Sequence, residues 1–207
     1  MVDNFNVIRG FMKFENPGDF YFLELLQRKK DGNNVVNGHH NTSRLIKDYY
    51  ISSLEQYDNL KDEIVEKCNS NNARAYIRLN KRNYKTVSLA FAEQMLMKVR
   101  TSQDFRNPKT EIASIVGQYH DAGKEKTWIV DLDDVGIDDP KVKKVIDIIA
   151  KVEPFDVEKV LSGIPTKSGL HLITKPFNHQ KFSTMVMEEL GENIDVHKDN
   201  PTVLYVS

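Results

Sequence analysis

Residues 127–136 read TWIVDLDDVG, an apolar segment that runs directly into a group of carboxylates. Side chains of an extended strand point alternately to its two faces, so every second residue shares a face. One face of this segment is apolar and carries Trp128, Val130 and Leu132. The opposite face carries Ile129, Asp131 and Asp133. We therefore expect the first face to pack under helices and the two aspartates to lie side by side on an open sheet face.

The sequence after this segment predicts two helices and three more strands. Apolar residues recur at helical spacing in two segments, and a turn containing Pro165 separates two strand-like segments between them. The predicted helices are 141–152 and 179–191, and the predicted strands are 126–134, 157–165, 168–177 and 194–207. This β-α-β-β-α-β order is that of the ferredoxin-like, or RRM-like, unit.

The chain before residue 121 has a different pattern. β-favouring segments predict strands at 19–27, 44–52 and 74–80. Helical spacing predicts helices at 54–68 and 85–100, the second of them apolar on most sides and therefore buried. We expect an α+β protein in which an N-terminal αβ unit (1–120) and an RRM-like unit (121–207) form one compact domain.

Composition limits the classes of protein to which the chain can belong. Its 207 residues are 40% hydrophobic and 29% charged, which is ordinary for a globular domain. The formal net charge of −1 gives no overall attraction to nucleic acid or membrane. The single cysteine, Cys68, excludes an internal disulfide and a cysteine zinc cluster. We find no apolar run of membrane-span length and no signal-peptide pattern, so we expect a cytoplasmic protein without membrane contact.

The predicted topology brings further polar residues to the two aspartates. Its first strand lies in the centre of the sheet, between the third and the fourth. Leu170 and Leu172 belong to the packed face, so His171 shares the open face with the aspartates, and Asp195 approaches from the other side. Three carboxylates form an all-oxygen site suited to Mg²⁺ or Mn²⁺, and two such metals can clamp the oxygens of a phosphoryl displacement. The nearby Lys167 and Ser168 could donate hydrogen bonds to a phosphate chain.

Three short motifs on these strands resemble those of a known family. IVDLD (129–133), KSGLH (167–171) and ID (194–195) have the order and spacing of the motifs of the archaeo-eukaryotic primase superfamily. That superfamily includes the primase-polymerases of plasmids and phages, and the resemblance covers residues 74–207. It makes the RRM-like unit the catalytic unit and implies primer synthesis or extension on a single-stranded DNA template from nucleoside triphosphates. The expected compartment of a phage protein is the host cytoplasm, and any unwinding partner would be a separate helicase.

The resemblance also implies roles for individual residues. Asp131, Asp133 and Asp195 would hold Mg²⁺ or Mn²⁺ as the catalytic carboxylates, with Asp199 as the alternative to Asp195. His171 would contact the incoming triphosphate, with Ser168 and Lys167 beside it. A segment outside the motifs, ARAYIRLNKRNYK (73–85), interleaves basic residues with tyrosines, a pattern that fits either a surface for the template backbone or an ordinary solvated strand edge and turn. Its basic residues include Arg74, Arg78, Lys81 and Arg82.

Two other functions fit parts of the same pattern. IVDLDDV also resembles the opening motif of haloacid-dehalogenase-like phosphatases, in which Asp131 would be the nucleophile and Asp133 the general acid. That family requires a parallel sheet and a second acidic strand end, and neither is predicted here. A non-catalytic RRM-like module would bind bases on aromatic side chains of its sheet, whereas the expected open face here is acidic.

Overall fold

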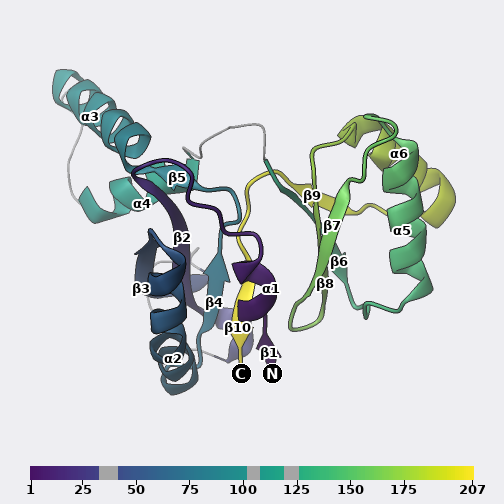
Figure 1. Cartoon of the computed structure of the whole chain (residues 1–207), viewed down its shortest axis with the longest axis horizontal. Coiled ribbons are helices and arrows are strands. Elements are labelled where there is room, and N and C mark those ends of the chain that lie inside the picture. The colour runs from purple at the N-terminus through teal and green to yellow at the C-terminus, as the bar shows by residue number, and fades with distance from the viewer. Residues whose placement is uncertain (33–41, 102–107, 119–125) are drawn as a thin grey trace.

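The computed structural model describes residues 1–32, 42–101, 108–118 and 126–207. It is an α+β structure with two antiparallel sheets that lie side by side (Figure 1), which confirms the predicted class. No helix in these ranges is both long and apolar enough to cross a membrane. The expected boundary between residues 120 and 121 lies outside the described residues.

The larger sheet is formed mostly by the first part of the chain. Its order is β1-β10-β4-β2-β3, and β5 pairs with the start of β2. These strands are β1 (Val2–Asp3), β2 (Asp19–Arg28), β3 (Ser43–Ile51), β4 (Arg74–Ile77), β5 (Arg82–Asn83) and β10 (Thr202–Val206). The predicted strands at 19–27, 44–52 and 74–80 are therefore present.

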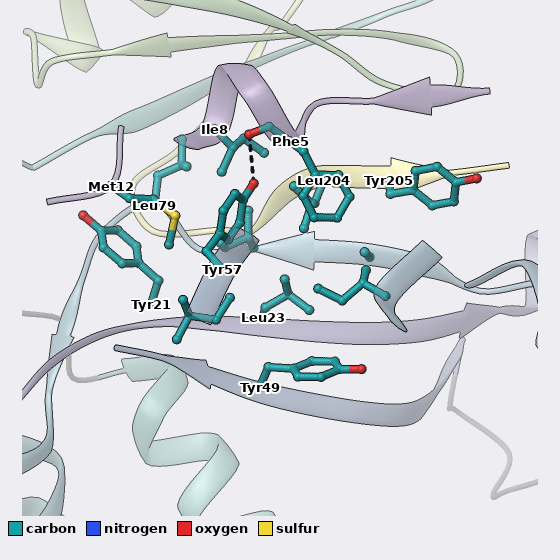
Figure 2. Close-up of a cluster of buried hydrophobic side chains, with 14 of the residues drawn as sticks. Phe5, Ile8, Met12, Tyr21, Leu23, Tyr49, Tyr57, Leu79, Leu204 and Tyr205 are labelled. Carbon is teal, nitrogen blue, oxygen red and sulfur yellow. Dashed lines mark hydrogen bonds between the residues drawn. The ribbon is translucent and has the colours of Figure 1, made fainter. Parts of the chain in front are cut away.

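Helices complete this part of the molecule. They are α1 (Phe5–Arg9), the short 3-10 helix η1 (Lys29–Asp31), α2 (Leu54–Ser70), α3 (Tyr84–Arg100) and α4 (Pro108–Gln118). Ser53 caps α2 by accepting a hydrogen bond from the backbone N–H of Gln56. Tyr57 of α2 is buried and donates to the carbonyl of Phe5 at 3.0 Å, which joins α2 to α1 inside the large core (Figure 2).

The prediction that α3 is buried is wrong. Only Val87 and Ala90 of this helix are buried, whereas Leu96 is 64% and Val99 63% exposed. In Figure 1 the helix projects away from the large sheet, and its main neighbours are α4 and β5. An apolar composition shows that a helix can be buried, but it does not show whether another element is there to cover it.

The smaller sheet holds the segment TWIVDLDD at its centre. Its order is β7-β8-β6-β9, with every neighbouring pair antiparallel. The strands are β6 (Trp128–Asp133), β7 (Val160–Pro165), β8 (Gly169–Thr174) and β9 (Asp195–His197), and the helices are α5 (Pro140–Lys151) and α6 (His179–Leu190). Both helices pack on one face of this sheet (Figure 1), over a core that includes Val130, Leu132, Leu170 and Leu172.

The other face of the small sheet is partly covered by the first half of the chain. Ile129, Ile164 and Ile173 belong to the large core together with Leu23 and Tyr57. The alternation predicted for residues 128–133 is therefore confirmed, but only the Asp131 and Asp133 end of the second face is open to solvent. The two sheets share one continuous apolar interior at the Ile129 end.

The C-terminal segment of the chain passes from the small sheet to the large sheet. After β9 in the small sheet, the chain continues to β10, which lies between β1 and β4 of the large sheet. Val2 pairs with Val206 and Thr202 pairs with Ile77, so the two chain ends lie next to each other (Figure 1). The extended segment 194–207 therefore serves both sheets.

Candidate active site

The backbone of the small sheet brings the sequence motifs together. Asp131 on β6 lies opposite His171 on β8 and, on its other side, opposite Asp195 on β9. Directly opposed residues of antiparallel strands have Cα atoms about 4.5–5.5 Å apart. Asp133 is two residues further along β6 and shares the face of Asp131. All four side chains therefore start from one small area of the sheet.

A glycine permits the close pairing at the end of β6. Gly169 lies opposite Asp133, and a Cβ atom added to Gly169 would stand 2.1 Å from the carbonyl oxygen of Leu132. No other residue fits there without moving the backbone. The glycine of the KSGLH motif therefore has a structural role, since it lets β8 approach the two aspartates of β6.

His171 connects the candidate site to the large sheet. Its Nε2 is 3.3 Å from Oδ1 of Asp131, and its Nδ1 is 2.8 Å from Oγ1 of the buried Thr202 on β10. His197 lies on the second side of the same carboxylate, with Nε2 3.9 Å from Oδ2 of Asp131. The hydrogen bond from His171 lowers the pKa of Asp131, and both histidines add attraction for its charged form. Asp131 is thus held as a carboxylate between two imidazoles.

A pocket of about 190 Å³ opens beside these residues, and we call it the acidic pocket. Its charged lining comes from β6, α5, the segment after α6 and β9, and consists of Asp131, Asp133, Lys141, Glu192 and Asp195. Lys141 is paired with Glu192 at 2.8 Å. Within the described part of the chain, the remaining three carboxylates form no ion pair with a lysine or arginine, and Lys30 adds only a weaker attraction for the charged form of Asp131.

The donor chemistry of the acidic pocket fits a hard cation, because three carboxylates supply the oxygen ligands that Mg²⁺ and Mn²⁺ prefer. The side chains do not form a metal site as they stand, since no three His, Cys, Asp or Glu side chains of the described residues lie close enough together to hold a metal ion. Asp133 and Asp195 are exposed, and exposed side chains change rotamer within nanoseconds. The strands thus place suitable donors around one pocket without arranging them as a finished coordination shell.

Lys167 forms an ion pair within the protein and does not project freely into solvent. Its Nζ is 2.8 Å from Oδ1 of Asp31, and Arg74 donates to both oxygens of the same carboxylate, from Nε at 2.7 Å and from Nη2 at 2.6 Å. This bond ties the β7–β8 turn to η1, the short helix that follows β2. Ser168 is exposed, and its carbonyl accepts from the N–H of Asp134 at 2.7 Å. The structure therefore shows a tethering contact for Lys167 and a backbone contact for Ser168.

The ion pairs of the Asp31 carboxylate predict how the stability of the folded protein depends on pH. Hydrogen bonds from Arg74, and then from Lys167, lower the pKa of Asp31 to about 2. A folded-state pKa below the unfolded value of about 3.9 stabilises the fold above that value, and this contribution is lost as the pH falls toward 2. We expect Asp31→Asn to lower the free energy of unfolding by about 2 kcal/mol at pH 6, with the difference from wild type disappearing near pH 2.

Urea unfolding at several pH values between 2 and 6 measures this difference. Asp62→Asn is the matched control, because Asp62 is exposed on α2 and carries the same charge. It should keep the acid sensitivity of the wild type. An Asp31→Asn protein that loses stability with falling pH as steeply as the Asp62→Asn protein would contradict the assignment.

The predicted basic surface needs correction, because most of its side chains are buried or bonded to other residues of the protein. They are Arg74, Arg78, Lys81 and Arg82. Arg82 is fully buried, Arg74 is 6% exposed, and Arg78 donates to the carbonyl of Asp199. Lys81 pairs with Glu15 at 2.9 Å and with Asp19 at 3.0 Å. Each cation has an internal acceptor, so the alternation of basic and aromatic residues reflects ion pairing between elements and not a surface for a template.

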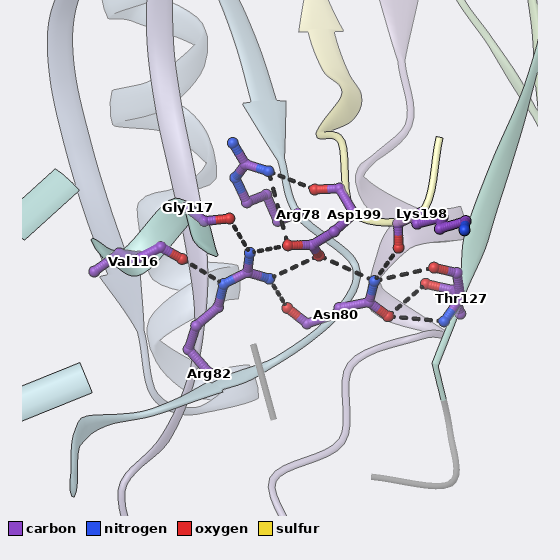
Figure 3. Close-up of polar contacts among 8 residues, drawn as sticks. All are labelled: Arg78, Asn80, Arg82, Val116, Gly117, Thr127, Lys198 and Asp199. Carbon is purple, nitrogen blue, oxygen red and sulfur yellow. Dashed lines mark hydrogen bonds and ion pairs between the residues drawn. The ribbon is translucent and has the colours of Figure 1, made fainter. Parts of the chain in front are cut away.

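Asp199, the alternative third carboxylate, belongs to this interior network (Figure 3). Its Oδ2 accepts from Arg82 Nη2 at 2.6 Å, and its Oδ1 accepts from Asn80 Nδ2 at 3.0 Å. Asn80 in turn binds Thr127, the residue just before β6. Asp199 therefore connects β5, the β4–β5 segment and β6, and it does not line the acidic pocket.

The sequence reasoning missed several residues around the site. His197 is two residues after Asp195, so the period of two that placed the aspartates could also have placed this histidine beside them. Thr202 carries no such signal, since it reaches His171 from the other sheet. Glu192 lies in a segment after α6 whose path the residue pattern does not give.

Searches for similar proteins do not extend this description. The chain matches no family model, no curated protein and no solved structure. The residues of the acidic pocket and their neighbours are therefore the observations that bear on function.

Proposed function

We propose that this chain is a metal-dependent nucleotidyltransferase of the primase-polymerase type, acting at the acidic pocket. The observation that carries the proposal is that Asp131, Asp133 and Asp195 line one pocket, with His171 directly opposite Asp131 in the sheet. The strand order β7-β8-β6-β9 supports it, because this is the order of a ferredoxin-like unit when β6 is its first strand. Its proposed substrates are a single-stranded DNA template and nucleoside triphosphates, and a helicase would be a separate partner.

The charge of the pocket determines how such a reaction would depend on cations. In the proposed reaction the 3′-hydroxyl oxygen of a primer bonds to the α-phosphorus of a nucleoside triphosphate, and pyrophosphate leaves as the hydroxyl loses its proton. Three carboxylates repel a triphosphate, so the pocket cannot hold this substrate unaided. Mg²⁺ or Mn²⁺ held by Asp131, Asp133 and Asp195 would neutralise this charge and stabilise the attacking and leaving oxygens.

The protein's own residues would prepare the pocket. His171 and His197 hold Asp131 as a charged ligand, and Thr202 fixes His171 from the large sheet. Contact between His171 and a triphosphate would require its Nε2 to leave Asp131, because both ring nitrogens have partners in the structure. Donors to a template would have to come from residues other than the buried Arg74 and Arg82.

The phosphatase alternative fits the observed sheet less well. β6 pairs with antiparallel neighbours on both sides, β8 and β9, whereas that reading requires a parallel sheet. The binding-module alternative fits poorly as well, because acidic side chains occupy the open end of the sheet. No observation in the described residues favours either over nucleotidyl transfer.

Incorporation of labelled nucleotides on a single-stranded DNA template tests the proposal. We expect product in the presence of Mn²⁺ or Mg²⁺ and none in EDTA, since the bare pocket repels the triphosphate. Reactions with and without a primer distinguish strand initiation from extension. A folded protein that forms no product with either metal, with or without primer, would remove the proposal and favour a screen of phosphatase substrates.

A further inference from the structure

A second hollow lies at the opposite end of β6 from the acidic pocket. It measures about 700 Å³ and is bounded by the segment between α1 and β2, by residues 126 and 127, and by the residues that follow β8. Ligand sites for small molecules usually occupy about 300–1,000 Å³. The lining of the hollow ends at Thr127 and that of the acidic pocket begins at Asp131, so roughly 13 Å of extended strand separates the two sites. We call this hollow the basic cavity.

Part of the wall of the basic cavity is apolar. Its hydrocarbon lining includes Phe11, Tyr21, Leu79 and Leu161. Tyr21 and Leu79 lie at one end of the large core (Figure 2), and the Tyr21 hydroxyl accepts from the N–H of Lys13 at 2.9 Å. That hydroxyl also donates to backbone carbonyls of Phe11 and Lys13, so the residue is fixed by its own surroundings. The wall therefore offers rigid apolar surface to an occupant.

The charged lining of the basic cavity is unbalanced. It contains four lysines, Lys13, Lys81, Lys126 and Lys175, against one carboxylate, Glu15. Lys81 is neutralised by Glu15 and Asp19. Lys126 and Lys175, in contrast, form no ion pair with any described residue.

Lys126 and Lys175, which have no ion pair among the described residues, reach the cavity from adjoining segments. Trp128 pairs with Thr174, and the two lysines lie just beyond this pair, each in the lining of the cavity. Two ammonium groups on the wall of one partly enclosed hollow attract an anion that enters it. Phosphate is suited to such a position, because lysine binds it as a point charge.

We propose that the basic cavity binds a small phosphorylated organic ligand of nucleotide size. Its phosphate lies between Lys126 and Lys175, and its apolar or aromatic body lies against Leu161 and Phe11. The lysines alone would account for inorganic phosphate, and the apolar wall alone for an uncharged ligand. The combination requires both parts in one molecule. This site is independent of the nucleotidyltransferase proposal, since no residue is shared between the two pockets.

Binding is measured with ATP, inorganic phosphate and adenosine as probes, using the full chain in EDTA. Without a divalent cation the acidic pocket repels ATP, so binding there does not contribute. Trp128, the only tryptophan, adjoins Thr127 of the cavity lining and gives a fluorescence signal, with calorimetry as the second readout. We expect ATP to bind at least about tenfold more tightly than adenosine or phosphate, because only ATP uses both the lysines and the apolar wall.

Charge reversal at the cavity is the main variant. The Lys126→Glu/Lys175→Glu protein should bind ATP at least about 100-fold more weakly, since each hydrogen bond to a charged group is worth roughly tenfold or more. Lys143→Glu/Lys144→Glu is the matched control, because both of these lysines are exposed on α5 and the change in net charge is the same. Leu161→Asn should weaken ATP binding and leave phosphate binding unchanged.

Several outcomes would overturn the proposal. Equal weakening by the α5 control would show only general attraction between the protein and an anion. Adenosine binding as tightly as ATP would remove the role of the lysines. A single-stranded oligonucleotide that displaces ATP, binds more tightly and depends on Lys126 and Lys175 would assign the cavity to a strand instead. Thermal melting and circular dichroism of each variant confirm that it is folded before its binding is compared.

Discussion

We expect the Arg82→Met protein to lose about 3 to 5 kcal/mol of unfolding free energy, the usual cost of removing one member of a buried ion pair. The Arg82 side chain is fully buried, and burial lowers its pKa, although Asp199 favours the charged form. Its guanidinium donates to the Asp199 carboxylate and to the carbonyls of Asn80, Val116 and Gly117 (Figure 3). Methionine fills part of the volume but leaves this carboxylate without its main donor.

Urea denaturation compares this protein with two others. Arg82→Lys keeps the charge but not the planar fork of donors, so its stability should lie between those of wild type and Arg82→Met. Arg9→Met is the surface control, because Arg9 pairs with Asp58 at 2.8 Å where both side chains are largely exposed. Its unfolding midpoint should stay close to that of the wild type. An Arg82→Met protein that is no less stable than Arg9→Met would show that the buried network does not hold the two sheets together.

The largest effect on activity is expected from Asp131. We expect Asp131→Ala to reduce nucleotide incorporation by at least about 100-fold. Removing an outer-shell partner of a metal ligand costs up to about 100-fold, and the loss of a direct ligand should cost no less. Asp131 is the carboxylate that touches both His171 and His197, and it lies between Asp133 and Asp195 in the acidic pocket. Its removal takes away the central oxygen donors and leaves two histidines without their partner.

The same assay distinguishes the roles of the other acids. Asp133→Ala and Asp195→Ala should also lose incorporation with little change in melting temperature, since both side chains are exposed. Asp199→Ala should mainly lower the melting temperature, because it breaks the pair with Arg82. Asp147→Ala, an exposed change on α5, is the control for altered charge. Full activity in both Asp131→Ala and Asp133→Ala would falsify the assignment of the acidic pocket as the reactive site.

Much of the small sheet could be predicted from local pattern. Alternation in residues 128–133 gave the two faces of β6, and the apolar Leu170 and Leu172 placed His171 on the face of Asp131. Such predictions succeed where one face of a strand is buried and the other is not, because a shift of one residue would exchange the two faces. The neighbourhood of Asp131 follows from this rule and from strand order.

Contacts between the two sheets were beyond the reach of this reasoning. Residues 194–207 have the same extended character throughout, so local pattern did not show that β9 and β10 belong to different sheets, although the segment DNP (199–201) is typical of a turn. The buried pair of Arg82 and Asp199 was missed for a related reason. Charged residues are usually exposed, and only the fold shows when two of them meet inside the protein.

The position of β10 affects the order in which the protein can assemble during synthesis. The large sheet needs residues 202–206 between β1 and β4, so the strand that pairs with Val2 is made some 200 residues later. Until then β1 has no neighbour and one edge of β4 is unpaired, and unpaired strand edges favour association with other chains. The first half of the chain therefore cannot finish folding on the ribosome ahead of the second, and completion of the large sheet waits for the segment that leaves the candidate active site.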